Sequence, residues 1–197
     1  MSEAERKITP ADILSEAQYN AQRDVLRAHS IAEKKNRRVE IGPYATLHFE
    51  NYRSMWLQVQ EMLRIEKGGA EQLAGELEAY NPLIPQGHEL IATFMIEIED
   101  AMRRERELRR LGHIEDSVYL EIGKERIAAT PTDYEDRTTA DGKTSSVHWL
   151  RFRFTPAQIA AFKADGERVT IGIAHPNYGH MAVLPAAMRA ALSKDFA

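Results

Sequence analysis

Residues 147–154 read Val-His-Trp-Leu-Arg-Phe-Arg-Phe and are the most informative stretch of the chain. In an extended chain, Leu150, Phe152 and Phe154 lie on one side and the residues between them on the other. A strand with one apolar and one polar face is typical of an antiparallel sheet with solvent on one side. The Asp-Gly pair at 141–142 favours a tight turn just before this strand.

Further strands and helices are expected on both sides of this stretch. Strand-like runs, rich in apolar and β-branched residues, occur at 39–41, 45–50, 90–98, 118–122, 169–174 and 181–184. Helical patterns or helix-start signals separate them, at 52–66, 70–80, 102–111, 155–164 and from residue 185 onward. Helices interrupt strands without a regular strand–helix–strand rhythm. We therefore expect an α+β fold with a mainly antiparallel β-sheet flanked by helices.

The N-terminus is expected to be helical. Thr9 and Asp12 have the spacing of a capping box, and apolar residues then recur at helical spacing over 13–31. A length of 197 residues suits one domain. We predict a single domain, with a helical N-terminal segment at 1–35 followed by an α+β body at 36–197.

Composition narrows the possible chemistry. The chain has no cysteine, which excludes a disulfide, an Fe–S cluster and a thiolate nucleophile. Lys plus Arg number 26 and Asp plus Glu number 30, a formal net charge of −4, so a nucleic-acid partner is not expected. No run approaches the roughly 18 apolar residues of a membrane span, and no signal-peptide pattern opens the chain. We expect a cytoplasmic protein.

Familiar catalytic patterns are missing from the sequence. It contains no Gly-x-Gly-x-x-Gly, no His-Glu-x-x-His and no Gly-x-Ser-x-Gly. The standard nucleotide-binding, zinc-protease and serine-hydrolase interpretations are therefore not supported. The sequence favours a non-catalytic role but leaves enzymatic activity open.

A histidine pair, His175 and His180, is the most specific candidate for a metal site. If the four residues between them form a hairpin loop, their Cβ atoms face each other at about 4.5–5.5 Å. A carboxylate such as Glu66 or Glu97 would complete a two-histidine, one-carboxylate set suited to non-haem iron, and iron or manganese is the expected metal. The alternative is that His175 only precedes a proline in a turn and His180 points into solvent.

Glu66 is the carboxylate of most interest in this set. On a helical wheel, the arc of Met55, Val59 and Met62 passes close to it. A carboxylate on a core face must be paired, be neutral or bind a cation, because an unpaired buried charge is costly. The alternative is that the helix frays before Glu66 and leaves it exposed beside Gly68.

The polar face of residues 147–154 offers a second candidate site. Arg151 and Arg153 lie there beside Trp149, and two arginines next to a tryptophan could hold the carboxylate or phosphate of a small anionic ligand. The alternative is an ordinary solvated sheet face, on which Glu97 of another strand could pair with the arginines.

Basic residues also crowd the predicted helix at 102–111. Arg103, Arg106, Arg109 and Arg110 could form an electrostatic docking surface for an acidic partner. The alternative is ordinary solvated surface. Aromatic residues are not interleaved with these arginines, so nucleic-acid binding is not indicated.

Several segments together resemble an uncharacterised bacterial family that is catalogued as a domain of unknown function. The matching segments are 8–13, 42–43, 49–51, 60–66, 78–81, 92–98 and 175–178. In that family the gene often lies beside those for rubrerythrin and a heterodisulfide-reductase-like iron–sulfur oxidoreductase. The resemblance implies an accessory or binding protein that works with these two partners in peroxide or redox metabolism. It brings no catalytic residues with it.

Overall fold

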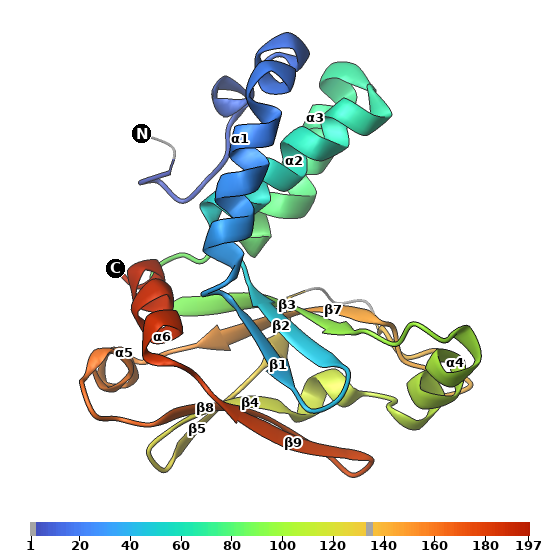
Figure 1. The fold of residues 1–197 in the computed structure, drawn as a ribbon, viewed down its shortest axis with the longest axis vertical. Helices are drawn as coiled ribbons and strands as arrows, with labels where there is room; N and C mark the ends of the chain where they lie inside the picture. The colour runs from blue at the N-terminus through green and yellow to red at the C-terminus, as the bar shows by residue number, and fades with distance from the viewer. Residues whose placement is uncertain (1–2, 133–135) are drawn as a thin grey trace.

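The computed structural model describes residues 3–132 and 136–197 and confirms the α+β class (Figure 1). Its helices are α1 (Glu16–Lys34), α2 (Tyr52–Glu66), α3 (Gly69–Tyr80), α4 (Ala101–Arg110), α5 (Pro156–Lys163) and α6 (Ala186–Leu192). Within these described parts, no helix combines the length and the apolar character needed to cross a bilayer.

The strands divide between two antiparallel sheets. The first, in the order β1-β2-β3-β7-β6, contains β1 (Arg38–Ile41), β2 (Ala45–Phe49), β3 (Glu89–Ile96), β7 (Val147–Arg153) and β6 (Thr130–Pro131). The second, in the order β5-β4-β8-β9, contains β5 (Glu125–Ala128), β4 (Val118–Ile122), β8 (Val169–His175) and β9 (Tyr178–Val183). The antiparallel pairing is therefore confirmed, and the division into two sheets is the added finding.

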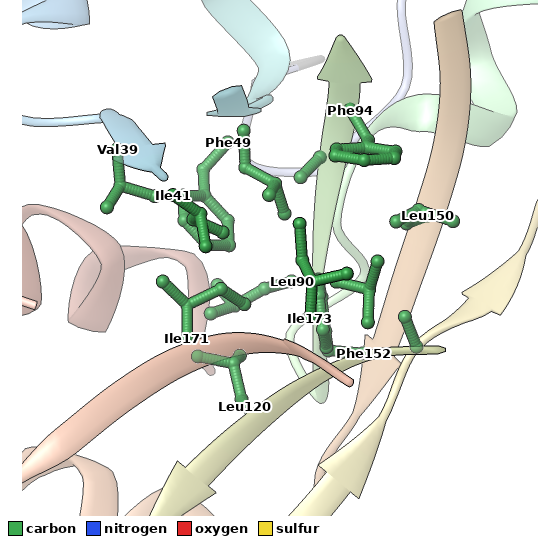
Figure 2. Close-up of a cluster of buried hydrophobic side chains, with 14 of the residues drawn as sticks. Val39, Ile41, Phe49, Leu90, Phe94, Leu120, Leu150, Phe152, Ile171 and Ile173 are labelled. Carbon is green, nitrogen blue, oxygen red and sulfur yellow. The ribbon is translucent and has the colours of Figure 1, made fainter. Parts of the chain in front are cut away.

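The main hydrophobic core lies between the two sheets (Figure 2). Leu90 and Phe94 of β3 and Phe152 of β7 contribute from the first sheet. Leu120 of β4 and Ile171 of β8 contribute from the second. All five side chains are fully buried. The apolar side of the alternating stretch at β7 therefore faces the second sheet, as its pattern predicts.

The outer face of the first sheet carries the helices of the N-terminal half. Met55 and Val59 of α2 pack with Ile91 of β3 in a second hydrophobic cluster, and the half-buried Trp149 of β7 packs against it. Figure 1 shows α1, α2 and α3 standing together on this side of the molecule. These three helices are called the helical bundle below.

The first long helix begins later than its sequence predicts. The capping box at Thr9 forms, but it opens only the 3-10 turn Pro10–Asp12. Ser15 caps α1, and its hydroxyl accepts a hydrogen bond from the backbone N–H of Gln18. Tyr19 is the buried residue of α1, so this helix rests on the rest of the protein over a narrow strip.

Candidate functional site

A groove of about 360 Å³ lies where α1, the end of β2 and the start of α2 meet. Its walls are mostly apolar. Leu26 of α1 and Trp56 and Leu57 of α2 are half-buried and line it. Small-molecule sites are typically clefts of about 300–1,000 Å³ with mainly apolar walls. The groove has the size and the lining of such a site.

Two polar side chains reach this groove from the outer face of β2. His48 and Glu50 alternate with the inward-facing Leu47, so they lie on the side of the helical bundle. Glu50 accepts hydrogen bonds from the hydroxyls of Thr93 (2.7 Å) and Ser54 (2.6 Å), which fix its carboxylate. Burial lowers the pKa of His48. Its imidazole is therefore neutral near pH 7 and offers hydrogen bonds rather than a charge.

The start of α2 forms a rigid side of the groove. The side chain of Asn51 accepts the backbone N–H of Ser54 (2.8 Å), and the Ser54 hydroxyl accepts the backbone N–H of Asn51 (2.9 Å). This reciprocal cap holds the first turn of the helix in place. The indole N–H of Trp56 donates to the carbonyl oxygen of Asp12 (2.9 Å), which fixes the ring.

Arg37 lines both this groove and a second, more polar hollow of about 510 Å³. Its guanidinium donates to the carbonyl oxygens of Phe49 (3.0 Å) and Glu50 (3.2 Å) and forms a buried ion pair with Asp195. Burial raises the pKa of Asp195 to about 6, although the charge of Arg37 opposes this. Titratable groups with shifted pKa values beside a cavity are typical of functional sites, and His48 and Asp195 fit that pattern.

Charged residues of both signs surround the groove on the side of α1. Glu33 pairs with Arg53 of α2 (3.6 Å), and the ring of His29 lies 4.0 Å from the other oxygen of Glu33. Lys34 lies beside them. Because positive and negative groups are interspersed, the groove has no strong preference for a charged ligand.

The predicted metal ligands His175 and His180 do not face each other. A two-residue turn at 176–177 joins β8 to β9, so His175 pairs with Tyr178 and the predicted four-residue loop is wrong. His180 is exposed, and its ring packs on the ring of Tyr178 with 4.5 Å between centroids. The Nε2 atom of His175 lies 3.2 Å from the carbonyl oxygen of Gly112.

The two predicted carboxylate ligands lie on other elements. Glu66 is the exposed last residue of α2 and accepts a hydrogen bond from Gln72 (3.2 Å), so its predicted place on a core face is wrong. Glu97 follows β3 and pairs with Arg38 (3.2 Å). Across residues 3–132 and 136–197, the histidine and carboxylate atoms close enough to share a metal ion belong to other residues.

The predicted anion-binding arginines are placed as their alternation indicates, on the outer face of β7. Arg151 donates to both carboxylate oxygens of Glu89 (3.0 and 2.8 Å), so its partner is Glu89 and not Glu97. Arg153 is exposed and Trp149 is half-buried. The guanidinium of Arg151 is therefore already engaged by a buried carboxylate of the same sheet.

Three of the four predicted docking arginines form ion pairs with glutamates of α4. The pairs are Arg106–Glu107 (3.4 Å), Arg109–Glu105 (2.9 Å) and Arg110–Glu107 (3.0 Å). The guanidinium of Arg103 lies 6.0 Å from the centre of the Tyr44 ring. This surface of α4 therefore carries mixed charges instead of a uniformly basic patch.

None of the groove residues stands out in the sequence, because segments far apart along the chain supply them. One local signal exists. On the strand predicted at 45–50, His48 and Glu50 are polar residues on the face opposite Leu47 and Phe49, directly before a helix start. Residues on this face lie next to the elements that cover the sheet, so polar side chains there are candidates for a binding site.

The molecule is thus an α+β protein of two packed antiparallel sheets, with a helical bundle on one face and a groove at their junction. The chain belongs to the family described as "Protein of unknown function (DUF3501)", which it matches over residues 7–196. This confirms its resemblance to an uncharacterised family.

A solved structure shares this fold. It is the crystal structure of a novel protein of unknown function from Burkholderia pseudomallei K96243, which is 36% identical to this chain, with a TM-score of 0.89. The similarity covers 97% of this chain and 100% of that chain. No curated protein matches the chain.

Proposed function

We propose that this protein is a binding protein that takes a small, uncharged and mostly apolar molecule into the groove between α1, β2 and α2. The observation that carries the proposal is the groove itself, with a volume of about 360 Å³ and with Leu26, Trp56 and Leu57 in its walls. Ligand sites combine apolar walls with a few fixed polar groups, and His48 and Glu50 supply these here.

The chemistry of the lining favours an aromatic ligand with a neutral polar group. Tyr52 and Trp56 offer ring surfaces on which a planar ligand can stack. The neutral imidazole of His48 can donate to a carbonyl or accept from a hydroxyl. A charged ligand would lose its hydration without gaining a matched counter-ion, because opposite charges alternate around the groove.

The groove is also largely ordered before any ligand arrives. The hydrogen bond from Trp56 to Asp12 and the two hydroxyls that hold Glu50 fix its main contact groups. A ligand therefore has few side chains to order on binding, and each one already fixed spares part of the entropy cost of association.

A fluorescent probe tests this proposal. N-phenyl-1-naphthylamine is neutral, apolar and bright only out of water, so we expect saturable binding to one site on the native chain. Ser30 of α1 is half-buried in the groove wall, and Ser30→Trp should fill the groove and abolish probe binding. Ala28→Trp places the same bulk on an exposed residue of the same helix and should leave binding unchanged.

The comparison of two probes then tests the ligand class. The anionic dye 8-anilinonaphthalene-1-sulfonate has a similar ring system and should bind more weakly than the neutral probe. Equal binding of the neutral probe by the Ser30→Trp variant and the unmodified protein would place the probe elsewhere and reject the groove. Tighter binding of the anionic dye would reject the uncharged class.

An accessory role beside a rubrerythrin and an iron–sulfur oxidoreductase stays a prediction from the family resemblance, and a cytoplasmic location stays a prediction from the sequence. The test is co-purification with both proteins at low and at high ionic strength. If the contact is electrostatic, charge reversal at Arg106 and Arg109 should weaken it, and so should added salt. Failure to associate at any ionic strength would reject the partnership and leave the ligand-binding proposal intact.

A further inference from the structure

A cluster of potential metal ligands shares no residue with the groove or with the predicted histidine pair. His113, Glu115 and Asp136 bring one imidazole nitrogen and two carboxylate oxygens within 4.8 Å of one another. His113 and Glu115 belong to the short connection between α4 and β4, where residues 114–117 form a 3-10 turn. Asp136 belongs to the segment that leads toward β7.

Glu115 is the unusual member of this cluster. It is only 5% exposed, and no group of residues 3–132 or 136–197 donates a hydrogen bond to its Oε2 atom. The Nδ1 atom of His148 lies 3.6 Å from that oxygen, which is longer than a hydrogen bond. A buried carboxylate oxygen without a donor carries a large desolvation cost, and a bound cation is one of the few ways to offset it.

Another buried residue, Thr138, links the backbone of His113 to the carboxylate of Asp136, the two exposed members of the cluster. Its hydroxyl accepts the backbone N–H of His113 (3.0 Å), and its own backbone N–H donates to Oδ1 of Asp136 (2.9 Å). The two segments are therefore tied to each other at the cluster. Because the two segments are already fixed relative to each other, less ordering is needed when a metal ion binds.

We propose that His113, Glu115 and Asp136 form a binding site for a divalent first-row transition-metal ion. One imidazole and two carboxylates are ligands that manganese, iron and zinc accept, and the two negative charges match a divalent ion. Three protein ligands leave positions for water or another molecule. The buried His148 lies next to this ligand, with its Nδ1 atom 3.6 Å from the Glu115 oxygen.

Manganese titration of metal-depleted protein tests the site. The electron paramagnetic resonance signal of free Mn²⁺ is lost on binding, and we expect one ion bound per chain. His113→Asn keeps a residue type that tolerates the left-handed backbone of this position, where φ is 58°. It and Asp136→Asn should each weaken binding by about tenfold or more. Asp116→Asn, at an exposed neighbour outside the cluster, is the matched control.

A further variant separates a metal site from a buried ion pair. If Glu115 serves the metal, Glu115→Gln removes binding while the metal-free protein keeps or gains thermal stability, because a buried charge is gone. If Glu115 instead serves an ion pair with His148, Glu115→Gln destabilises the protein and does not change metal content.

Stability gives a second measure of the same binding. Mn²⁺ should raise the melting temperature of the unmodified protein and not that of Asp136→Asn, since a ligand of the folded state stabilises it by mass action. The proposal is overturned if the depleted protein binds none of Mn²⁺, Fe²⁺ and Zn²⁺. It is equally overturned if His113→Asn and Asp136→Asn bind as the unmodified protein does.

Discussion

The hydroxyl of Tyr178 donates a hydrogen bond to the carbonyl oxygen of Ile41, 2.6 Å away. The same hydroxyl oxygen accepts the backbone N–H of Ala45 (3.1 Å). Tyr178 begins β9 of the second sheet, whereas Ile41 and Ala45 flank the turn between β1 and β2 of the first. One buried side chain therefore joins the edges of both sheets.

Removal of this hydroxyl should destabilise the protein. Tyr178→Phe leaves the carbonyl oxygen of Ile41 without this donor in a buried place, and we expect the free energy of unfolding to fall by about 1–3 kcal/mol. Urea denaturation measures the change. Tyr80→Phe is the control, because its hydroxyl accepts a long hydrogen bond from the exposed amide of Gln58 (3.4 Å). Equal losses in the two variants would contradict a special role for Tyr178.

Gly42, in the same turn, should not tolerate a side chain. Its φ is +72°, and an added Cβ would lie 2.6 Å from the ring of His180 and 2.7 Å from the hydroxyl of Tyr178. Gly42→Ala should therefore cost more stability than the backbone strain of about 1–2 kcal/mol alone. Gly69→Ala isolates that strain, because φ there is +71° and, apart from the adjoining chain, no described residue has a heavy atom within 4 Å of an added Cβ. Similar losses at both glycines would show that the contact is harmless.

Glu61 should make the contact between α1 and α2 sensitive to acid. It accepts hydrogen bonds from Arg23 (2.7 and 2.8 Å) and from the hydroxyl of Tyr19. The hydrogen bond from Arg23 is the main reason that the pKa of Glu61 falls to about 2. A lowered pKa in the folded state gives stability that is fully present above pH 4.5, the ordinary pKa, and is lost as pH falls toward about 2.

Substitution of this carboxylate checks that pH dependence. Glu61→Gln should lower stability by about 1 kcal/mol near neutral pH and should reduce its decline between about pH 4.5 and pH 2.5. The measurement is urea unfolding across that range, followed by circular dichroism. Glu66→Gln changes an exposed glutamate of the same helix and should leave the pH profile as it is. An unaltered profile in Glu61→Gln would contradict the assignment.

The buried pair of Arg37 and Asp195 should respond to neutralisation of its members. Arg37→Met leaves Asp195 without its counter-ion, and because protonation of a carboxyl whose pKa is already about 6 limits the penalty, the loss of the ion pair should cost about 1–2 kcal/mol at pH 7. The loss should shrink as pH falls through about 6, because burial raises the pKa of Asp195 to about 6 and its protonated form needs no counter-ion. Adding Asp195→Asn should recover part of the melting temperature. A double variant as unstable as the single one would contradict this account.

The individual helices and strands of this fold could be predicted from the sequence, because their patterns depend on neighbouring residues. The alternation of β7 and the capped start of α2 follow from neighbouring residues alone. The division into two sheets could not be predicted in this way, because strand order depends on pairing between segments that are far apart in the sequence. Helical spacing in α1 also misleads: Val25 is 74% exposed and Ile31 59% exposed, because periodicity shows that an apolar stripe exists and not that anything covers it.

The candidate sites were harder to predict because each depends on geometry that one or two residues can change. The turn between β8 and β9 has two residues instead of four, which pairs His175 with Tyr178 and moves His180 two positions along the strand. The cluster around Glu115 depends on a burial that no local pattern shows. Asp136 is separated in sequence from His113 and Glu115 by the whole of β4, β5 and β6.

The two walls of the groove belong to different parts of the molecule, and this has a mechanical consequence. α1 belongs to the helical bundle, whereas β2 belongs to the sheet, and residues 35–37 join α1 to the neighbouring strand β1. The width of the groove therefore depends on the tilt of the bundle over the sheet. A molecule bound there would contact both the helical bundle and the sheet and would limit their relative movement. Ligand binding would therefore restrict the position of the whole of α1 relative to the sheet, including turns of the helix that do not contact the ligand.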